Sequence, residues 1–163
     1  MILSMIRIGI GYDVHRFEAG RPFVLGGVRI PYERGLMGHS DGDALLHAVI
    51  DAMLGAAGLK DIGHQFPDTD QRYKGADSAR LLAEVRAMVE TEGYRVVNVD
   101  TVVIVEQPRL AKHIDRIRAR IAEVLGVSVG AVAVKGKTNE GFGYIGEGEG
   151  LAAWATVLIE RSG

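Results

Sequence analysis

The sequence GHSDGDALLH at residues 38–47 decides the fold, because it marks the start of the first helix. Ser40 or Asp41 is a suitable N-cap for a helix that begins at Gly42, since a side-chain oxygen there can accept the unpaired N–H groups of the first turn. The helix is expected to end within residues 55–58, where small residues and glycine follow one another. Apolar residues at helical spacing predict its core face: Leu46, Val49, Ile50, Met53 and Leu54.

A polar stripe on the same helix points to a metal site. Asp43, His47 and Asp51 stand at four-residue intervals and share one side of the helix. Upstream, Asp13 and His15 are two residues apart, and in a strand they project from one face, roughly 7 Å apart. A carboxylate and two imidazoles suit zinc, and three protein ligands leave a fourth position for water or substrate. We therefore predict a catalytic zinc site at Asp13, His15 and His47, with Asp51 either orienting a histidine ring or serving as a cap or surface residue.

Composition limits the class of protein. The 163 residues suit one domain, residues 1–163, with a real hydrophobic core. The net charge of −2 gives no global basic field for nucleic acid or an anionic membrane. The absence of cysteine excludes disulfides and thiolate metal sites and fits a reducing compartment. Residues 1–6 are too short for a signal-peptide core, and residues 102–105 are far too short to span a membrane. We expect a soluble, cytoplasmic protein.

Strands and helices alternate along the chain without a repeat or a linker. Strands are expected at residues 6–10, 23–25, 28–30, 96–106, 132–134 and 151–159. Helices are expected at the quoted stretch, from Asp77 or Ser78 to Gly93, and at residues 110–125. This pattern predicts an α+β fold, with α/β as the alternative, in which helices cover one face of the sheet. Self-association would bury the other face.

Two further segments carry chemistry. In KGKTNE at residues 135–140, lysines and backbone N–H groups suit phosphate oxygens, and Glu140 suits a hard cation such as magnesium or manganese. An exposed turn with ordinary charges is the alternative. Residues 59–70 form a loop with three aspartates that can hold ribose hydroxyls, order a lid or cap turns. Together with the zinc triad, residues 135–140 indicate diphosphate chemistry.

Five segments in this order resemble the 2-C-methyl-D-erythritol 2,4-cyclodiphosphate synthase family. They are GYDVH at residues 11–15, HSDGD at 39–43, DIG at 61–63, FPDTD at 66–70 and KTNE at 137–140. The resemblance implies a homotrimer with active sites between subunits. It also implies conversion of the CDP-linked 2-phosphate of methylerythritol to a cyclic diphosphate, with release of CMP.

The resemblance also implies roles for single residues. It places zinc on Asp13, His15 and His47, and a second divalent ion, magnesium or manganese, on Glu140. It gives His39 and Thr138 the role of stabilising the transition state. The positions that it assigns to substrate binding are Asp13, His15, His39, Ser40, Asp61, Ile62, Gly63, Phe66, Pro67, Asp68, Thr69, Asp70, Val105, Pro108, Arg109, Leu110, Ala111, Lys137, Thr138, Asn139, Glu140 and Tyr144.

The chain departs from the family pattern near its C-terminus. Glu147 stands where many members carry an arginine that faces the trimer axis, and Tyr144 replaces a usual phenylalanine. Because a carboxylate does not bind a diphosphate as arginine does, we predict weak or absent binding of isoprenoid diphosphates along that axis.

Two other functions are compatible with the residues. An open zinc site can activate water, which would make the protein a nucleotide-diphosphate phosphohydrolase. Alternatively, a closed metal site would serve only to lock subunits of a non-catalytic, trimeric nucleotide-binding module.

Overall fold

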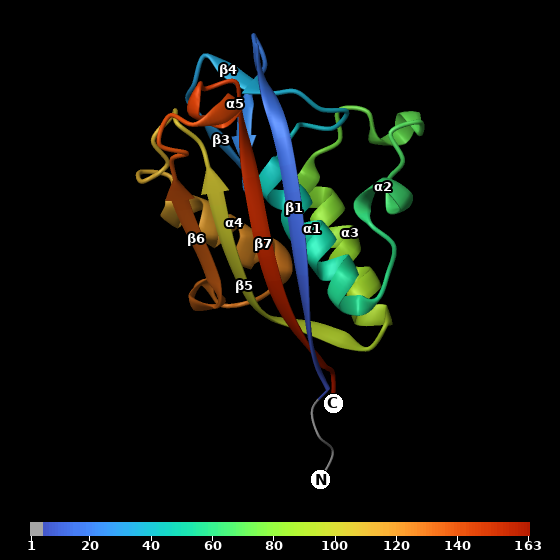
Figure 1. The fold of residues 1–163 in the computed structure, drawn as a ribbon. Helices are drawn as coiled ribbons and strands as arrows, with labels where there is room; N and C mark the ends of the chain where they lie inside the picture. The colour runs from blue at the N-terminus through green and yellow to red at the C-terminus, as the bar shows by residue number, and fades with distance from the viewer. Residues whose placement is uncertain (1–4) are drawn as a thin grey trace.

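The computed structural model describes residues 5–163, and at its centre lies a five-stranded mixed sheet (Figure 1). The strand order is β4-β1-β7-β5-β6, with β5 and β6 parallel and the other pairs antiparallel. A separate hairpin joins β2 to β3. The strands are β1 (Ile6–Ala19), β2 (Phe23–Leu25), β3 (Val28–Ile30), β4 (Arg34–Leu36), β5 (Tyr94–Ile104), β6 (Val132–Lys137) and β7 (Gly150–Arg161).

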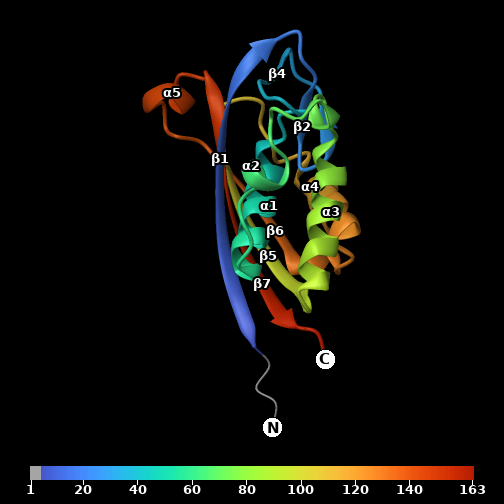
Figure 2. The ribbon, with the colours of Figure 1, turned by 90° about the vertical axis from the view of Figure 1, so that its right-hand side faces the viewer.

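The long helices lie on one face of this sheet, and the short α5 lies on the other side (Figure 2). The helices are α1 (Ala44–Ala57), α2 (Ile62–Gln65), α3 (Ser78–Thr91), α4 (Ile114–Leu125) and α5 (Gly143–Gly146), with 3₁₀ turns η1 (Gln71–Tyr73) and η2 (Val129–Ala131). The predicted α+β class is therefore confirmed. Among the described residues, none of the helices combines the length and apolar character needed to cross a membrane.

Strand β1 is longer than the sequence predicted. It pairs with β7 from Ile6, opposite Glu160, to Arg16, opposite Gly150, and its last residues pair with β4. The prediction of residues 6–10 was too short because the polar Asp13 and His15 interrupt the apolar pattern while the backbone ladder continues through them. Both residues lie on the face of β1 that the helices cover, as the two-residue spacing predicted.

The start of α1 also differs from the prediction. Gly42 has a φ of +77°, so the helix cannot begin there, and Asp43 is the N-cap through its bond from the Leu46 N–H. Asp43 is fully buried and also accepts the N–H groups of Gly26 and Gly27 in the β2–β3 turn. The predicted caps were wrong, and Asp43 does not belong to an open polar stripe.

The remaining elements match the prediction unevenly. The hairpin strands and the Asp77 cap of α3 are confirmed. Helix α4 begins at Ile114 instead of residue 110, and β6 continues to Lys137. The short β4, α2 and α5 lie in segments where neither a strand nor a helix was predicted, because three or four residues carry too little periodicity to be recognised.

The open face of the sheet is apolar along β1 and β7. Ile8 is 70% exposed and Ile10 is 72% exposed, although both are large aliphatic residues. Tyr12 and Trp154 follow on the same face, with ring centroids 4.7 Å apart. Contiguous apolar surface of this kind marks an interaction site. The prediction that a trimer buries this face stays a prediction.

Candidate metal centre and flanking cavities

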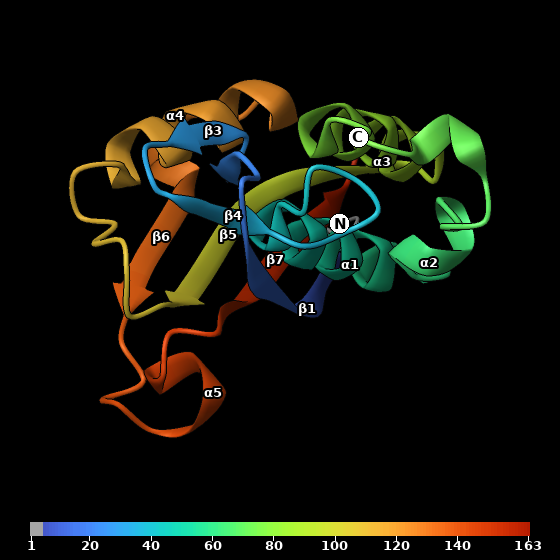
Figure 3. The ribbon, with the colours of Figure 1, turned by 90° about the horizontal axis from the view of Figure 1, so that it is seen from above.

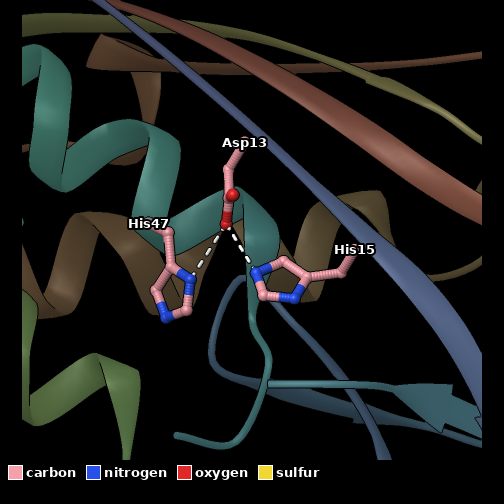
Figure 4. Close-up of side chains that lie close together, drawn as sticks. All are labelled: Asp13, His15 and His47. Atoms are coloured by element: carbon pink, nitrogen blue, oxygen red, sulfur yellow. Dashed lines mark hydrogen bonds and ion pairs between the residues drawn. The ribbon is translucent and has the colours of Figure 1, made fainter. Parts of the chain in front are cut away.

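Three predicted metal ligands converge at the helix-covered face of β1 (Figure 4). The Asp13 Oδ2 atom lies 2.8 Å from His15 Nε2 and 2.9 Å from His47 Nδ1. One ligand atom from each of the three side chains lies within 4.8 Å of the others. This is a compact group of one carboxylate and two imidazoles, which fits a divalent metal ion.

Two glycines of β1 let α1 pack close to the strand, which places His47 beside Asp13 and His15. A Cβ atom on Gly11 would lie 1.8 Å from the Ala48 carbonyl oxygen, and one on Gly9 would lie 1.9 Å from the Ala52 carbonyl oxygen. Only glycine permits this separation between helix and strand. Because Ala48 follows His47, the same contact sets the position of the histidine relative to β1.

The neighbouring groups shift the pKa values of Asp13 and His15 in opposite directions. Burial raises the pKa of Asp13, but hydrogen bonds and charges from His15 and His47 outweigh it and lower this pKa to about 2. Burial lowers the pKa of His15, but the hydrogen bond with Asp13, the Asp13 charge and the Met37 carbonyl together outweigh it, so the pKa of His15 is raised. Asp13 is therefore ionised at neutral pH, as a metal ligand must be.

The ring nitrogens that face away from Asp13 have protein partners. His15 Nδ1 contacts the Met37 carbonyl oxygen, which can only accept, so this nitrogen carries a proton, and Nε2, which faces the Asp13 carboxylate, would be the nitrogen that binds a metal ion. His47 Nε2 lies 2.9 Å from Ser78 Oγ and 3.1 Å from Ser40 Oγ. With both outer nitrogens engaged, the inner nitrogens and the Asp13 carboxylate form a donor set that fits a metal ion.

A cavity of about 360 Å³ adjoins these ligands, and we call it the histidine cavity. His39 Nε2 is buried there without a hydrogen-bond partner among the described residues, so this nitrogen is free to bind a ligand group. The lining residues are Asp13, His15, His39, Ser40, His47, Asp51, Ile62, Gly63, Phe66, Asp68, Tyr73 and Leu81.

Asp51 has a different role from the one suggested by its spacing from His47. Its Oδ1 accepts the backbone N–H of Ile62 at 2.8 Å, so it anchors the first turn of α2 and forms no bond to a histidine ring. Burial raises the pKa of Asp51, which the Ile62 N–H partly offsets. Of the two roles predicted for Asp51, the orientation of a histidine ring is wrong and the capping role is confirmed, because its Oδ1 accepts the first N–H of α2.

The loop after α1 supplies other lining residues of the histidine cavity. Asp61 caps α2 and accepts His64 Nδ1–H at 2.7 Å, and Phe66 packs edge-on against the Tyr73 ring. Asp70 accepts Arg72 Nη2–H at 2.6 Å. Four predicted contacts are not lining residues of the histidine cavity, although they belong to the same loop: Asp61, Pro67, Thr69 and Asp70.

Lys137 and Thr138 line a second cavity of about 160 Å³, which we call the threonine cavity. Beyond it, Thr138 Oγ1 donates to Glu140 Oε1 at 2.6 Å, and the Asn139 N–H donates to Glu106. Glu140 has a φ of +51°, a backbone strain of the kind that occurs at ligand sites. The lining residues are Val105, Pro108, Arg109, Leu110, Ala111, Ile114, Gly136, Lys137 and Thr138.

Within this chain, β1 and β6 lie on opposite sides of β7 and β5 in the sheet (Figure 3). The histidine cavity includes β1 residues and the threonine cavity includes β6 residues, and β7 and β5 lie between these strands. Three inter-strand spacings separate β1 from β6 by roughly 14 Å. The structure therefore brings the predicted metal ligands together but does not bring them to Thr138. Tyr144, on α5, lies close enough to Tyr12 to raise the pKa of that phenol, and it lines neither of the two cavities.

Sequence reasoning missed several residues of the centre. Ser78 contacts His47, and Tyr73 and Leu81 line the histidine cavity. All three come from segments far along the chain from His47, so no local spacing indicates that they belong to the site. Gly9 and Gly11 did carry a signal, because they alternate on the same strand face as Asp13.

Comparison with known proteins agrees with the resemblance seen in the motifs. The YgbB family profile matches residues 6–160. The 2-C-methyl-D-erythritol 2,4-cyclodiphosphate synthase of Chromobacterium violaceum is 58% identical over 97% of this chain and 100% of its own length. That of Synechococcus sp. (strain JA-2-3B'a(2-13)) is 56% identical over 94% of this chain and 98% of its own.

Solved structures show the same fold. IspF of Plasmodium falciparum, solved as a CDP complex, matches with a TM-score of 0.86 and 34% identity over 99% of both chains. The bifunctional IspDF of Campylobacter jejuni matches with a TM-score of 0.94 and 40% identity, covering 98% of this chain and 43% of that one. The chain therefore belongs to the YgbB family, that of the 2-C-methyl-D-erythritol 2,4-cyclodiphosphate synthases.

Proposed function

We propose that the protein converts CDP-linked methylerythritol 2-phosphate to methylerythritol 2,4-cyclodiphosphate and CMP. An oxygen of the 2-phosphate attacks the β-phosphorus, a new P–O–P bond forms, and the bond from the β-phosphorus to the CMP oxygen breaks. Because attacking and leaving groups belong to one bound molecule, positioning and charge neutralisation supply the catalysis, and no protein nucleophile is needed. The convergence of Asp13, His15 and His47 beside the histidine cavity is the observation that carries this proposal.

In this proposal Asp13, His15 and His47 hold zinc. When bound, zinc acts as a Lewis acid that withdraws charge from phosphate oxygens. His39, whose Nε2 has no partner among the described residues, donates a hydrogen bond to the phosphate group in the histidine cavity. Residues 61–70 close over the methylerythritol part of the substrate.

The threonine cavity receives the CDP part. Lys137 offers charge and Thr138 a hydroxyl to the diphosphate, and Glu140 holds the second divalent cation, magnesium or manganese. Residues 105–111 surround the cytidine. The support is the shared lining of this cavity by residues 105–111 and by Lys137 and Thr138. A related IspF was solved as a CDP complex, which agrees with a nucleotide site in this fold.

We also propose a homotrimer in which each active site is completed by a second chain. The two cavities lie toward opposite edges of one chain's sheet, and the open face of that sheet exposes Ile8, Ile10 and Trp154. Packing three copies through this apolar face would place the β1 edge of one chain next to the β6 edge of another. The predicted cytoplasmic location stays a prediction.

The reaction is tested by incubating the protein with the CDP-linked substrate and magnesium and measuring CMP release. We expect stoichiometric cyclic diphosphate, loss of turnover after zinc chelation, and recovery on adding zinc. In ¹⁸O-labelled water the products should contain no solvent oxygen. Incorporation of solvent oxygen would identify a phosphohydrolase, and parental function in His39→Ala and Thr138→Ala would favour a non-catalytic binding module.

Subunit sharing has its own test. His39→Ala and Thr138→Ala are each expected to be inactive alone. Co-expressed, they should restore activity at up to about a quarter of the sites, because those sites combine two unmodified halves from different chains. Absence of any recovery in mixed trimers would show that each site is formed within one chain.

A further inference from the structure

A chain of three side chains continues outward from the metal centre through His47. The His47 ring directs Nδ1 to Asp13 Oδ2 at 2.9 Å and Nε2 to Ser78 Oγ at 2.9 Å. Ser78 Oγ in turn donates to Asp41 Oδ1 at 2.5 Å. Ser78 is fully buried, at 0% exposure, so its hydroxyl has no access to bulk water.

The protons in this chain can be placed from the acceptors. The Ser78 hydroxyl donates its single proton to Asp41 Oδ1. Ser78 Oγ then offers only lone pairs to His47, and the His47 Nε2 must carry the proton. Nδ1 faces the Asp13 carboxylate, and a metal ion bound there would displace the proton between the two groups; with Nε2 keeping its proton, Nδ1 would be the ligand atom.

We propose that Ser78 and Asp41 are positioning residues that fix the tautomer and the orientation of His47 for metal binding. This inference rests on the proposed metal site and deepens it. Ser78 is the first residue of α3, and Asp41 precedes the N-cap of α1. The relay therefore joins the starts of two helices to one ligand.

Asp41 is itself held in place by several bonds. Its Oδ2 accepts the Ser78 N–H at 3.0 Å, and its Oδ1 accepts the Asp43 N–H at 3.1 Å. Its own N–H donates to the Ala76 carbonyl oxygen at 3.1 Å. The carboxylate that orients Ser78 is thus fixed by backbone groups of both segments.

Two further contacts of the ligand histidines, Ser40 with His47 and the Met37 carbonyl with His15, contain no side-chain carboxylate that fixes the proton. Ser40 Oγ lies 3.1 Å from the same His47 nitrogen, but no carboxylate accepts the Ser40 proton in the structure, so this hydroxyl does not define a tautomer. His15 uses the main-chain oxygen of Met37, which no side-chain substitution removes. Only the orientation of His47 depends on a side-chain relay.

Zinc affinity of the full chain tests the relay, measured by competition with a chromophoric chelator. Ser78→Ala removes the acceptor, and we expect zinc to bind about 10- to 100-fold more weakly. Asp77→Ala is the matched control, because Asp77 caps the same helix end by accepting the Ala79 N–H and has no contact with a histidine. It should keep the parental affinity. Cobalt substituted into Ser78→Ala should show an altered visible spectrum, whereas the control should match the parent.

Parental zinc affinity in Ser78→Ala would overturn the relay while leaving the metal site standing. A parent protein that binds no zinc would overturn the proposed metal site and the relay with it. If Ser78→Ala does not fold, Asp41→Asn decides the question. It keeps the size of the side chain and an oxygen for the Ser78 hydroxyl but removes the charge, and we expect a smaller loss, of several-fold. Parental affinity in that variant would overturn the relay.

Discussion

We predict that Gly11→Ala disrupts the metal centre, although Gly11 itself supplies no metal ligand. The added methyl group would lie 1.8 Å from the Ala48 carbonyl oxygen, whereas ordinary contacts begin at 3.4 Å. The obstacle is helix backbone, which cannot rotate away as a side chain can, so α1 must move by roughly 1.6 Å. His47 moves with it. Because metal–ligand distances hold within about 0.2 Å, zinc affinity should fall together with stability.

The cost in stability follows from overpacking. Inserting carbon atoms into a close-packed core costs about 1–3 kcal/mol. We expect about 3 kcal/mol for Gly11→Ala, because the clash involves backbone and the neighbouring Gly9 prevents an easy tilt of the helix. For a chain of this size, that corresponds to a fall in melting temperature of about 6–12 °C.

Gly55→Ala is the matched control on the same helix. A Cβ atom there meets nothing within 4 Å, so the substitution should stabilise the protein by up to about 1 kcal/mol through helix propensity. The measurements are thermal unfolding and zinc content after dialysis. A Gly11→Ala protein that keeps the parental melting temperature and a full zinc content would refute the reasoning.

Three other outcomes are expected. Asp51→Ala should raise KM about tenfold with a smaller change in kcat, because the Ile62 N–H loses its partly buried acceptor. Asp51→Asn should restore KM, and equal KM values in all three proteins would contradict this. In chelated, metal-free protein, the Asp13 pKa of about 2 lies below its unfolded value of about 3.9, so about 2 kcal/mol of stability is present above pH 4 and lost as the pH falls toward 2. Urea unfolding at pH 5 and pH 2.5 measures that loss, which Asp13→Asn should reduce. Ile10→Glu, on the exposed sheet face, should convert the proposed trimer to monomers in sedimentation analysis, and an unchanged mass would place the interface elsewhere.

The features that could be predicted from the sequence depend on local backbone geometry, such as the alternation of side chains along a strand. Asp13 and His15 share a face because strand residues alternate, and the bounds of the β2–β3 hairpin followed from Gly26 and Gly27, which both adopt positive φ. Asp77 caps α3 as expected because its side chain meets a neighbouring N–H group. Each of these inferences needs only local chain geometry.

The errors arose where a polar side chain had a choice of partners. Residues 40–43 contain three good N-cap residues, and Asp43 was selected because the distant Gly26 and Gly27 N–H groups also need an acceptor. Asp51 likewise bonds the Ile62 N–H, a backbone donor that needs an acceptor. Buried donors must be satisfied, so partner choice depends on which backbone groups the tertiary structure leaves open.

The strand order carries information that no motif contains. The five motifs identify the chemistry, yet they are equally compatible with a site formed within one chain or between two. Strand β6 lies beyond β7 and β5 from β1, and both intervening ladders are continuous, so β1 and β6 of one chain cannot approach each other without breaking them. This separation supports the proposal that a substrate contacting both His39 and Thr138 bridges two chains. The apolar residues of β1 and β7 face outward from this same sheet, and burying them against other copies is the step that would complete each site.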